Sequence, residues 1–469
     1  MIKEYDVAVI GAGPGGYVAA IRCAQLGKNV LLAEKENLGG VCINWGCIPT
    51  KFLIHQLKLF QEIKENKNIQ GPVDQIKINL EKLQGNKKRG VDRLVKGIEF
   101  ILNRNKVSVI KGEARFVSPD EIIINGKKRK DDIRAKKIIL ATGSRPGNLP
   151  LMKANGNEIM NSKQALEITR VPSNLLVIGA GVIGLEIGSL FNRLGAEVTV
   201  LEIMPQILPG SDAKTAKILQ RELKRQGLEI QTEMKIQEYS VKKDRVAVKG
   251  TDLKKDSPFG FKAEKILLAV GRQPNSDKIQ KELPDLELDK HGFVKVNEFM
   301  ETNIENIYAI GDLTGGKLLA HKASHEGIIA AENAAGGHKK MDHSAVPSSV
   351  FTEPECSSVG LTEEEAQEKY GDDVRIGKFP LRASGRAVTL GSMEGFVKII
   401  AHKNEKVLGA HILSPHSSEM IHEVTLALKY GIKISELGSL VHVHPTLSES
   451  IMESALNAQN KAIHILNKQ

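Results

Sequence analysis

The sequence has few cysteines, few aromatic residues and no long apolar run. Its 469 residues include four cysteines, too few for a fold held together by disulfides. A close pair of cysteines in such a chain indicates redox or metal chemistry instead. No apolar stretch reaches the roughly 20 residues that a membrane-spanning helix needs. We therefore expect no membrane partner.

The charged residues do not indicate a nucleic-acid partner. Lysine and arginine total 66 against 56 acidic residues, a net charge of +10, but the basic residues are spread along the chain and aromatic residues make up only 4% of it. No nucleic-acid-binding motif is present. Residues 1–10 have the pattern of a first strand rather than of a charged and apolar leader. These features predict a cytoplasmic protein that does not bind nucleic acid.

One pattern occurs twice: a strand, a glycine-rich turn, a helix, and a second strand that ends at an acidic residue. In the first copy the strands are 6–10 and 30–33, the helix runs to residue 26, and the key residues are Gly11, Gly13, Gly16 and Glu34. In the second copy the strands are 175–178 and 198–201, the helix runs to residue 194, and the key residues are Gly179, Gly181, Gly184 and Glu202. The offset from the first glycine to the acidic residue is 23 in both copies.

Each part of this pattern suits a dinucleotide. The first glycine allows a tight turn, the second lets the backbone approach a pyrophosphate, and the third lets helix and strand pack closely. The helix N-terminus attracts phosphate, and the carboxylate accepts hydrogen bonds from ribose. Two copies predict FAD and a nicotinamide cofactor; two turns without a ligand are the alternative. Glu202 would repel a 2′-phosphate, and no arginine occurs between it and Arg221, which favours NAD over NADP.

Cys42 and Cys47 form the one close cysteine pair. Residues five apart point to different sides of a regular helix, so a disulfide requires a bend, which Asn44 or Gly46 would allow. A helix that opens near Pro49 would lower the pKa of a nearby thiol and favour the reactive thiolate. No second cysteine or histidine pair stands at zinc spacing, so we expect no metal site. The other two cysteines are expected to be structural: Cys23 in the first helix and Cys356 in a polar loop.

The segment 39–51 resembles the active-site signature of the class I pyridine nucleotide-disulfide oxidoreductases, and the similarity extends along nearly the whole chain. Segments 141–144 and 269–275 resemble those that close the two nucleotide domains, and 308–312 resembles the second flavin motif. The resemblance implies an α/β fold with two Rossmann-like domains, for FAD and NAD, a central domain and a C-terminal α+β dimerisation domain. The expected boundaries are 1–150 for the first part of the FAD domain, 151–275 for the NAD domain, 276–345 for the central domain and second FAD part, and 346–469 for the dimer interface.

The resemblance also implies site residues. Cys42 and Cys47 would form the redox disulfide, and Glu186 would pair with Lys51 between flavin and nicotinamide. The expected FAD contacts are Gly11, Gly13, Gly16, Glu34, Lys51, Ala114, Thr142, Gly143, Asp312 and Ala320. The expected NAD contacts are Gly179, Gly181, Gly184, Glu186, Glu202 and Gly271.

His444 and Glu449 are a candidate catalytic pair, because a carboxylate can fix the tautomer of an imidazole and raise its basicity. Two histidines beside a proline are by themselves a weak signal. The resemblance implies that His444 is an acid–base, held by Glu449, that serves the disulfide of the other subunit in a homodimer. His442 is interpreted as a bystander on the same face of an extended segment. His321 and His325 are expected on a helix, as structural or cofactor-lining residues.

Within this family, the sequence is most similar to members that oxidise dihydrolipoyl groups. It lacks the arginine pair after Glu202 that an NADP-linked glutathione reductase would carry, and it has no cysteine after Cys356, unlike mercuric reductases. Trp45, Thr50 and a 382–386 loop without asparagine depart from the usual pattern. The implied partners are a lipoylated carrier protein and the acyltransferase core of 2-oxo acid dehydrogenase complexes, or a glycine cleavage complex. The alternatives are an NADH-dependent reductase of another disulfide and a mainly structural subunit of such a complex.

Overall fold

The computed structural model describes residues 2–126, 129–242 and 245–467, and it divides the chain into two compact units. Unit 1 comprises Met1–Leu149, Asn161–Arg170 and Val270–Asp342. Unit 2 comprises Pro150–Met160, Val171–Ala269 and His343–Gln469. Within the described residues, no helix combines the length and the apolar character needed to cross a membrane.

Unit 1 is built on a seven-stranded sheet in the order β3-β2-β1-β6-β5-β4, with β17 also paired to β6. Its strands are β1 (Lys3–Ile10), β2 (Val30–Glu34), β3 (Ser108–Lys111), β4 (Glu113–Ser118), β5 (Glu121–Asn125), β6 (Lys130–Leu140) and β17 (Ile307–Ala309). The start of β6 pairs antiparallel with β5, and its end pairs parallel with β17. The parallel strands around β1 therefore form a nucleotide-binding type of sheet, as predicted.

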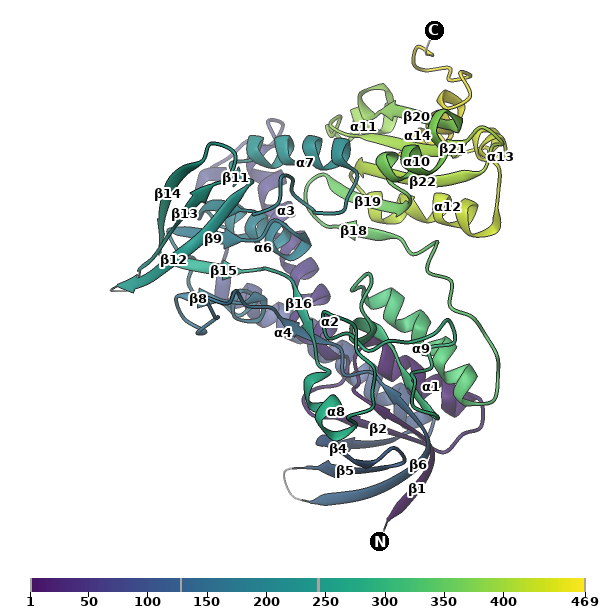
Figure 1. Ribbon diagram of the computed structural model, residues 1–469. Helices are drawn as coiled ribbons and strands as arrows, with labels where there is room; N and C mark the ends of the chain where they lie inside the picture. Colours follow the sequence, from purple (N-terminus) through teal and green to yellow (C-terminus); the bar gives the residue numbers. More distant parts are fainter. Residues whose placement is uncertain (1, 127–128, 243–244, 468–469) are drawn as a thin grey trace. The chain divides into compact units, whose positions relative to one another are not determined.

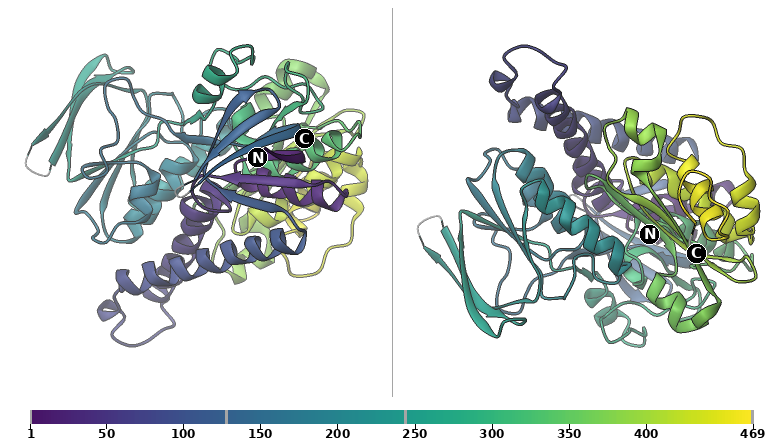
Figure 2. Two further views of the ribbon diagram at one scale, coloured as in Figure 1. Left: turned by 90° about the horizontal axis from the view of Figure 1, so that it is seen from below. Right: turned by 90° about the horizontal axis from the view of Figure 1, so that it is seen from above.

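The helices of unit 1 cover this sheet and carry the cysteine pair. They are α1 (Pro14–Gln25), α2 (Gly40–Trp45), α3 (Cys47–Glu65), α4 (Leu80–Arg104), α5 (Ser162–Leu166), α8 (Asp277–Glu282) and α9 (Ala320–Ala334), with short 3-10 turns at Val73–Gln75 and Gly311–Thr314. Helices α1 and α9 pack against each other (Figure 1). The long helices α3 and α4 run side by side (Figure 2). A two-stranded ribbon of β7 (Ser144–Pro146) and β16 (Arg272–Pro274) completes the unit.

The first half of unit 2 repeats the parallel arrangement. Its sheet has the order β11-β10-β9-β15-β8 and consists of β8 (Ile159–Met160), β9 (Asn174–Ile178), β10 (Glu197–Leu201), β11 (Glu229–Gln231) and β15 (Lys265–Leu268). Helices α6 (Val182–Arg193) and α7 (Ala213–Arg225) accompany this sheet. A separate antiparallel sheet contains β12 (Met234–Lys242), β13 (Arg245–Asp252) and β14 (Ser257–Ala263). This repetition confirms the two Rossmann-like units.

The C-terminal half of unit 2 is an antiparallel sheet flanked by helices. Its strands, in the order β18-β19-β22-β21-β20, are β18 (Ser348–Val350), β19 (Glu355–Gly360), β20 (Val374–Pro380), β21 (Phe396–His402) and β22 (Val407–Ser414). Its helices are α10 (Glu363–Tyr370), α11 (Gly385–Thr389), α12 (Ser417–Tyr430), α13 (Ile434–Ser439) and α14 (Glu449–Asn457), with 3-10 turns at Gly371–Asp373 and Leu381–Ala383. Cys356 lies buried in β19, so the expectation of a polar loop was wrong. Cys356 pairs directly with Val350 on β18 and with Leu413 on β22, and this pairing of distant segments places it in a strand.

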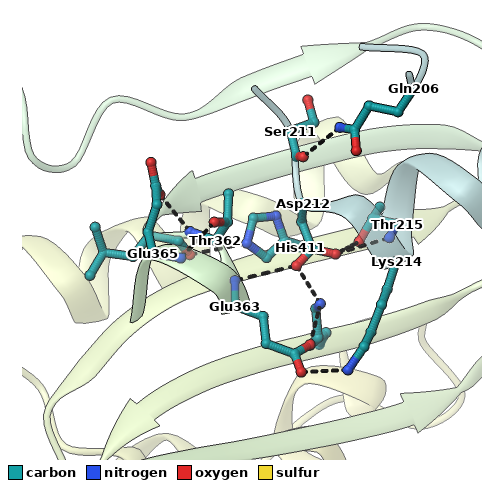
Figure 3. A network of polar contacts seen from close by, with 11 residues as sticks. Gln206, Ser211, Asp212, Lys214, Thr215, Thr362, Glu363, Glu365 and His411 are labelled. Atoms are coloured by element: carbon teal, nitrogen blue, oxygen red, sulfur yellow. Dashed lines mark hydrogen bonds and ion pairs between the residues drawn. The ribbon is translucent and has the colours of Figure 1, made fainter. Parts of the chain in front are cut away.

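A buried charged cluster joins α7 to this second sheet within unit 2 (Figure 3). Lys398 on β21 lies 2.5 Å from Asp212 and 3.0 Å from Glu363, and its side chain is only 2% exposed. Asp212 also caps α7 by accepting a hydrogen bond from the Thr215 N–H. His411, also buried, bonds the Leu361 carbonyl. The two halves of unit 2 are therefore tied by paired charges.

The units differ from the expected domains in several places, and residues 270–275 of the predicted NAD domain belong to unit 1. Residues Asn161–Arg170 fall inside the predicted NAD domain but belong to unit 1. The reason is polar: Gln84 and Lys87 on α4 donate hydrogen bonds to the carbonyls of Ile168 and Leu166. The four-part division itself stays a prediction.

Candidate active site

The two glycine-rich turns have the same geometry. Gly11 and Gly179 both have φ = +103°, a conformation that favours glycine. A Cβ on Gly16 would lie 1.8 Å from the Gly11 carbonyl oxygen, and one on Gly184 would lie 1.9 Å from that of Gly179. Only glycine allows this contact between helix and strand.

The second glycine of each turn, Gly13 or Gly181, borders space that the protein does not fill. A Cβ on Gly13 or Gly181 would have no protein atom within 4 Å. Each of these glycines precedes the first residue of its helix, α1 or α6, and no side chain caps either helix. The free N–H groups and the positive end of each helix therefore suit a pyrophosphate. Both turns fit the dinucleotides predicted for them.

The acidic residues at the ends of β2 and β10 also repeat. Glu34 accepts a hydrogen bond from the Ala12 N–H at 2.7 Å, and Glu202 accepts one from the Ala180 N–H at 2.7 Å. Each carboxylate is thus held beside its own glycine turn, where a ribose would lie. Glu202 is 6% exposed. A second negative charge, such as a 2′-phosphate, would be disfavoured in such a buried place.

Asp312 is fixed by residues that sequence reasoning missed. Ser144 on β7 donates a hydrogen bond to its carboxylate, and Arg272 on β16 lies 3.5 Å from the same oxygen while bonding the Ser144 hydroxyl at 2.6 Å. Burial lowers the pKa of the Arg272 guanidinium, and the nearby Asp312 carboxylate partly offsets this shift. The three positions are far apart in sequence, so only the pairing of β7 with β16 brings them together.

Two side chains of α9 hold the turn that carries Asp312 by hydrogen bonds. Lys322 and Glu326 form a buried ion pair of 3.0 Å, with side chains 3% and 1% exposed. Lys322 donates to the Gly315 carbonyl, and Glu326 accepts from the Gly311 N–H, both at 2.8 Å. The regular i, i+4 spacing of this pair was a signal available in the sequence.

The remaining predicted cofactor residues occupy turns and edges. Thr142 and Gly143 bond Asn275, whose side chain donates to the Thr142 carbonyl at 2.8 Å. Gly271 has φ = +96° and its carbonyl accepts from the Gly147 N–H. Ala114 lies in β4 and Ala320 opens α9. All ten predicted FAD contacts lie in unit 1, together with Gly271 from the predicted NAD set.

Cys42 and Cys47 are brought together, without a disulfide between them, where α2 ends and α3 begins. The break falls at Gly46, which has φ = −133° and ψ = −117°, and a Cβ there would meet the Val41 carbonyl oxygen at 2.8 Å. Asn44 does not bend the chain; its amide donates to the carbonyls of Leu38 and Gly40 within and before α2. The predicted bend is confirmed at Gly46 only.

The two thiols are chemically unequal. A hydrogen bond with Cys47, together with burial, raises the pKa of the Cys42 thiol, and Lys51 partly offsets this. The Cys42 thiol therefore holds its proton more firmly than an ordinary thiol does. Cys47 is exposed at the first residue of α3. By contrast, burial raises the pKa of Cys23 and of Cys356 to about 12, which makes both thiols unreactive.

Trp45, the one tryptophan of the chain, sits beside the pair at the end of α2. Its ring lies 5.6 Å from the Lys163 ammonium and 6.0 Å from the Arg272 guanidinium. Cation–π contacts of this length stabilise by roughly 0.5–1 kcal/mol each at exposed sites. The unusual residue in the signature is therefore anchored, and it links the cysteine turn to the arginine that holds Asp312.

His444 and Glu449 form the predicted hydrogen bond, 2.8 Å between Nδ1 and Oε1. The other carboxylate oxygen accepts from the Thr446 N–H at 2.7 Å. Burial alone would raise the pKa of Glu449, but the Thr446 and His444 hydrogen bonds outweigh it and lower that pKa. The ionised carboxylate keeps the proton of neutral His444 on Nδ1, which leaves Nε2 to accept a proton. The imidazole is 78% exposed.

His442 and Glu186 lie in environments that the sequence did not reveal. The side chain of His442 is 6% exposed and bonds Glu423 at 2.9 Å, so the expectation that it shares a face with His444 was wrong. Glu186 is buried on α6 and accepts a hydrogen bond from the Phe351 N–H at 2.9 Å. Its pairing with Lys51, which lies in unit 1, stays a prediction. His321 and His325 are exposed on α9.

The chain matches one protein family over most of its length. Residues 5–327 match the pyridine nucleotide-disulphide oxidoreductase family, and residues 346–455 match the dimerisation domain of the same family. The chain belongs to the pyridine nucleotide-disulphide oxidoreductases. As a member of this family, it is an FAD- and NAD-dependent oxidoreductase with a domain that supports a homodimer.

Several relatives of this oxidoreductase span its full length. It is 44% identical to the dihydrolipoyl dehydrogenase of Thermus scotoductus over 100% of both chains. It is 40% identical to the mitochondrial dihydrolipoyl dehydrogenase of Pisum sativum, covering 98% of this chain and 93% of that one. A solved structure, the Cu(II) complex of the HOCl-induced flavoprotein disulfide reductase RclA from Escherichia coli, is 28% identical with a TM-score of 0.86, over 97% of this chain and 99% of that one.

Proposed function

We propose that this oxidoreductase is a dihydrolipoyl dehydrogenase, which oxidises protein-bound dihydrolipoyl-lysine to lipoyl-lysine and reduces NAD to NADH. The observation that carries the proposal is the 38–44% identity, over 98–100% of this chain, to dihydrolipoyl dehydrogenases from several organisms. The thiol pair Cys42–Cys47 and the His444–Glu449 pair supply the chemistry that such a reaction needs.

The dithiol reaction begins with the Cys42–Cys47 pair as a disulfide. His444 takes a proton on Nε2 from one substrate thiol. The resulting thiolate attacks the Cys42 sulfur, so that a substrate–Cys42 disulfide forms and the Cys42–Cys47 bond breaks. The second substrate thiol then gives up its proton and attacks the substrate sulfur that is bonded to Cys42, and the displaced Cys42 sulfur takes that proton. The substrate leaves as a cyclic disulfide, oxidised by two electrons. The protein retains the Cys42 thiol, the Cys47 thiolate and the proton on His444.

The protein then passes the electron pair from its two cysteines on to NAD. The Cys47 thiolate faces the flavin in this proposal, and Cys42 keeps the proton of the pair, in line with its raised pKa. When bound, FAD would supply the two-electron transfer between the thiol pair and NAD. Gly11, Gly13, Gly16, Glu34, Lys51, Ala114, Thr142, Gly143, Asp312 and Ala320 would hold the flavin, and Gly179, Gly181, Gly184, Glu186, Glu202 and Gly271 would hold NAD.

The assembly is part of the proposal. His444 and Glu449 lie in unit 2 and the cysteines in unit 1, and in the proposed homodimer His444 would serve the cysteine pair of the partner subunit. The lipoyl group would arrive on a carrier protein attached to the acyltransferase core of a 2-oxo acid dehydrogenase complex, or on a glycine cleavage carrier. A cytoplasmic location completes the proposal.

The test is NAD reduction by free dihydrolipoamide, with NADP and with reduced glutathione measured in parallel. The purified, FAD-loaded protein should form NADH rapidly, and NADP should be a poor acceptor because Glu202 occupies the place of a 2′-phosphate. Glutathione should support little turnover, since it lacks a second thiol to displace Cys42. Turnover with a different thiol alone would favour the related disulfide reductases; full binding to an acyltransferase without any turnover would favour a structural subunit.

A further inference from the structure

The segment that presents His444 has little packing to hold it in place. Val441 is 93% exposed and Val443 is 77% exposed, and the His444 side chain is 78% exposed. A cleft of about 360 Å³ separates residues 445–448 from α11 and the start of α12, where Arg386 and Glu419 line its other side. Leu437 and Leu447 are buried in the apolar core on either side of this segment. Between them, the position of His444 depends on a few polar ties.

One tie lies on each side of His444. On the C-terminal side, Glu449 bonds both His444 and the Thr446 N–H. On the N-terminal side, His442 is the one inward-facing side chain of residues 441–444. Its Nε2 lies 2.9 Å from Oε1 of Glu423 on α12, and its Nδ1 lies 3.0 Å from the Leu440 carbonyl oxygen.

The His442–Glu423 contact requires a proton held between the two groups. A carbonyl oxygen can only accept a hydrogen bond, so Nδ1 of His442 carries a proton and donates a hydrogen bond to the Leu440 carbonyl oxygen. Nε2 can then bond Glu423 in two ways: as imidazolium to carboxylate, or as neutral imidazole to carboxylic acid. Burial raises the pKa of Glu423, although His442 opposes this, so the carboxyl group retains protons more readily than an exposed one. Either arrangement makes a directional, partly buried hydrogen bond.

We propose that Glu423 and His442 are positioning residues for His444: the pair pins the presenting segment to α12 and so keeps Nε2 of His444 aimed at the substrate dithiol. This inference rests on the proposed function and adds two residues to it. Neither residue touches the reacting atoms. A displacement of about 1 Å in a reacting group can lower a rate on the order of 100-fold, so loss of the pin should slow the dithiol step selectively.

The experiment compares two half-reactions in FAD-loaded variants. The first is flavin reduction by dihydrolipoamide, which needs His444; the second is electron transfer from NADH to a dye, which does not. We expect His442→Phe and Glu423→Leu to slow the first by about 10–100-fold and to leave the second at the wild-type rate. Glu423→Gln should recover most of the first, because its amide N–H can donate to Nε2 of neutral His442.

Matched variants make the result decisive. His422→Phe changes an exposed histidine next to Glu423 on α12 and should leave both half-reactions unaltered. His444→Gln sets the full loss expected when the base itself is removed. If wild-type protein fails to oxidise dihydrolipoamide while the dye reaction proceeds, the proposed function fails. If wild-type protein oxidises dihydrolipoamide and His442→Phe does so at the same rate, the positioning role is overturned. Equal losses in both half-reactions would also overturn it, and so would a Glu423→Gln variant as slow as Glu423→Leu.

Discussion

Replacing Cys47 by serine should abolish dihydrolipoamide turnover while the protein remains folded and yellow. The serine hydroxyl cannot form the disulfide that the substrate thiolate breaks, and it cannot supply a thiolate to the flavin. Removal of a covalent nucleophile typically costs 10³-fold or more, up to about 10⁶-fold, so turnover should fall to background. The glycine turn around Gly11 and the Asp312 cluster are unchanged, so FAD should stay bound. Flavin absorbance and NADH-to-dye transfer are the two measurements.

Cys356→Ala is the matched control for this variant. Cys356 is a buried thiol in β19, and its pKa is raised to about 12 by burial, so it should not take part in the reaction. The control should turn over at the wild-type rate. A Cys47→Ser protein that still oxidises dihydrolipoamide at a rate near that of wild type would show that the cysteine pair is not the redox centre.

Replacing Lys398 by methionine should strongly destabilise unit 2. The ammonium group lies between Asp212 and Glu363, which are 0% and 5% exposed (Figure 3). Without it, the two carboxylates lose their buried ammonium partner, and the 63% exposed Lys214 ammonium and the His411 ring are left beside them. Breaking a buried ion pair by removing one partner costs about 3–5 kcal/mol. Chemical denaturation followed by circular dichroism measures the loss.

A surface lysine provides the comparison. Lys403, 56% exposed, pairs with Asp373 at 2.8 Å, and an exposed pair contributes only about 0–1 kcal/mol. Lys403→Met should therefore barely change the unfolding midpoint. The effect of Lys398→Met should persist in mildly acidic solution. Burial alone would raise the pKa of Asp212, but His411 and Lys398 lower it below the ordinary value of 3.8. The stabilisation from the ionised carboxylate is therefore fully present above pH 3.8. It is lost only as the pH falls through the lowered pKa of the folded protein. Similar losses in both variants would contradict the role of the buried cluster.

Much of the site could be predicted because its parts are local in sequence. The two glycine turns, Glu34 and Glu202 lie within single strand–turn–helix units, where spacing alone decides the geometry. The Cys42–Cys47 bend follows from one glycine between the short helix α2 and the long helix α3. The His444–Glu449 pair needs only one turn of chain. In each case a few neighbouring residues determine the contact.

The residues that were missed depend on contacts between distant segments. Ser144 and Arg272 meet Asp312 only because β7 pairs with β16. The alternation of an extended segment predicts that His442 points in the same direction as His444, and this prediction was wrong. The carboxylate on α12 that draws it inward, Glu423, stands 19 residues earlier in the chain. No local sequence pattern predicts a partner at that distance along the chain.

The most direct test of the central claim is to count thiols at each cysteine during one turnover. The oxidised, FAD-loaded protein is mixed without oxygen with one equivalent of dihydrolipoamide, alkylated, and digested so that the peptides of Cys42, Cys47, Cys23 and Cys356 are measured separately. We predict that Cys42 and Cys47 change together from disulfide to alkylated thiol, that excess NAD reverses the change with one NADH formed per pair, and that the two buried cysteines stay constant throughout. NADH formation with no change at Cys42 and Cys47 would contradict the account.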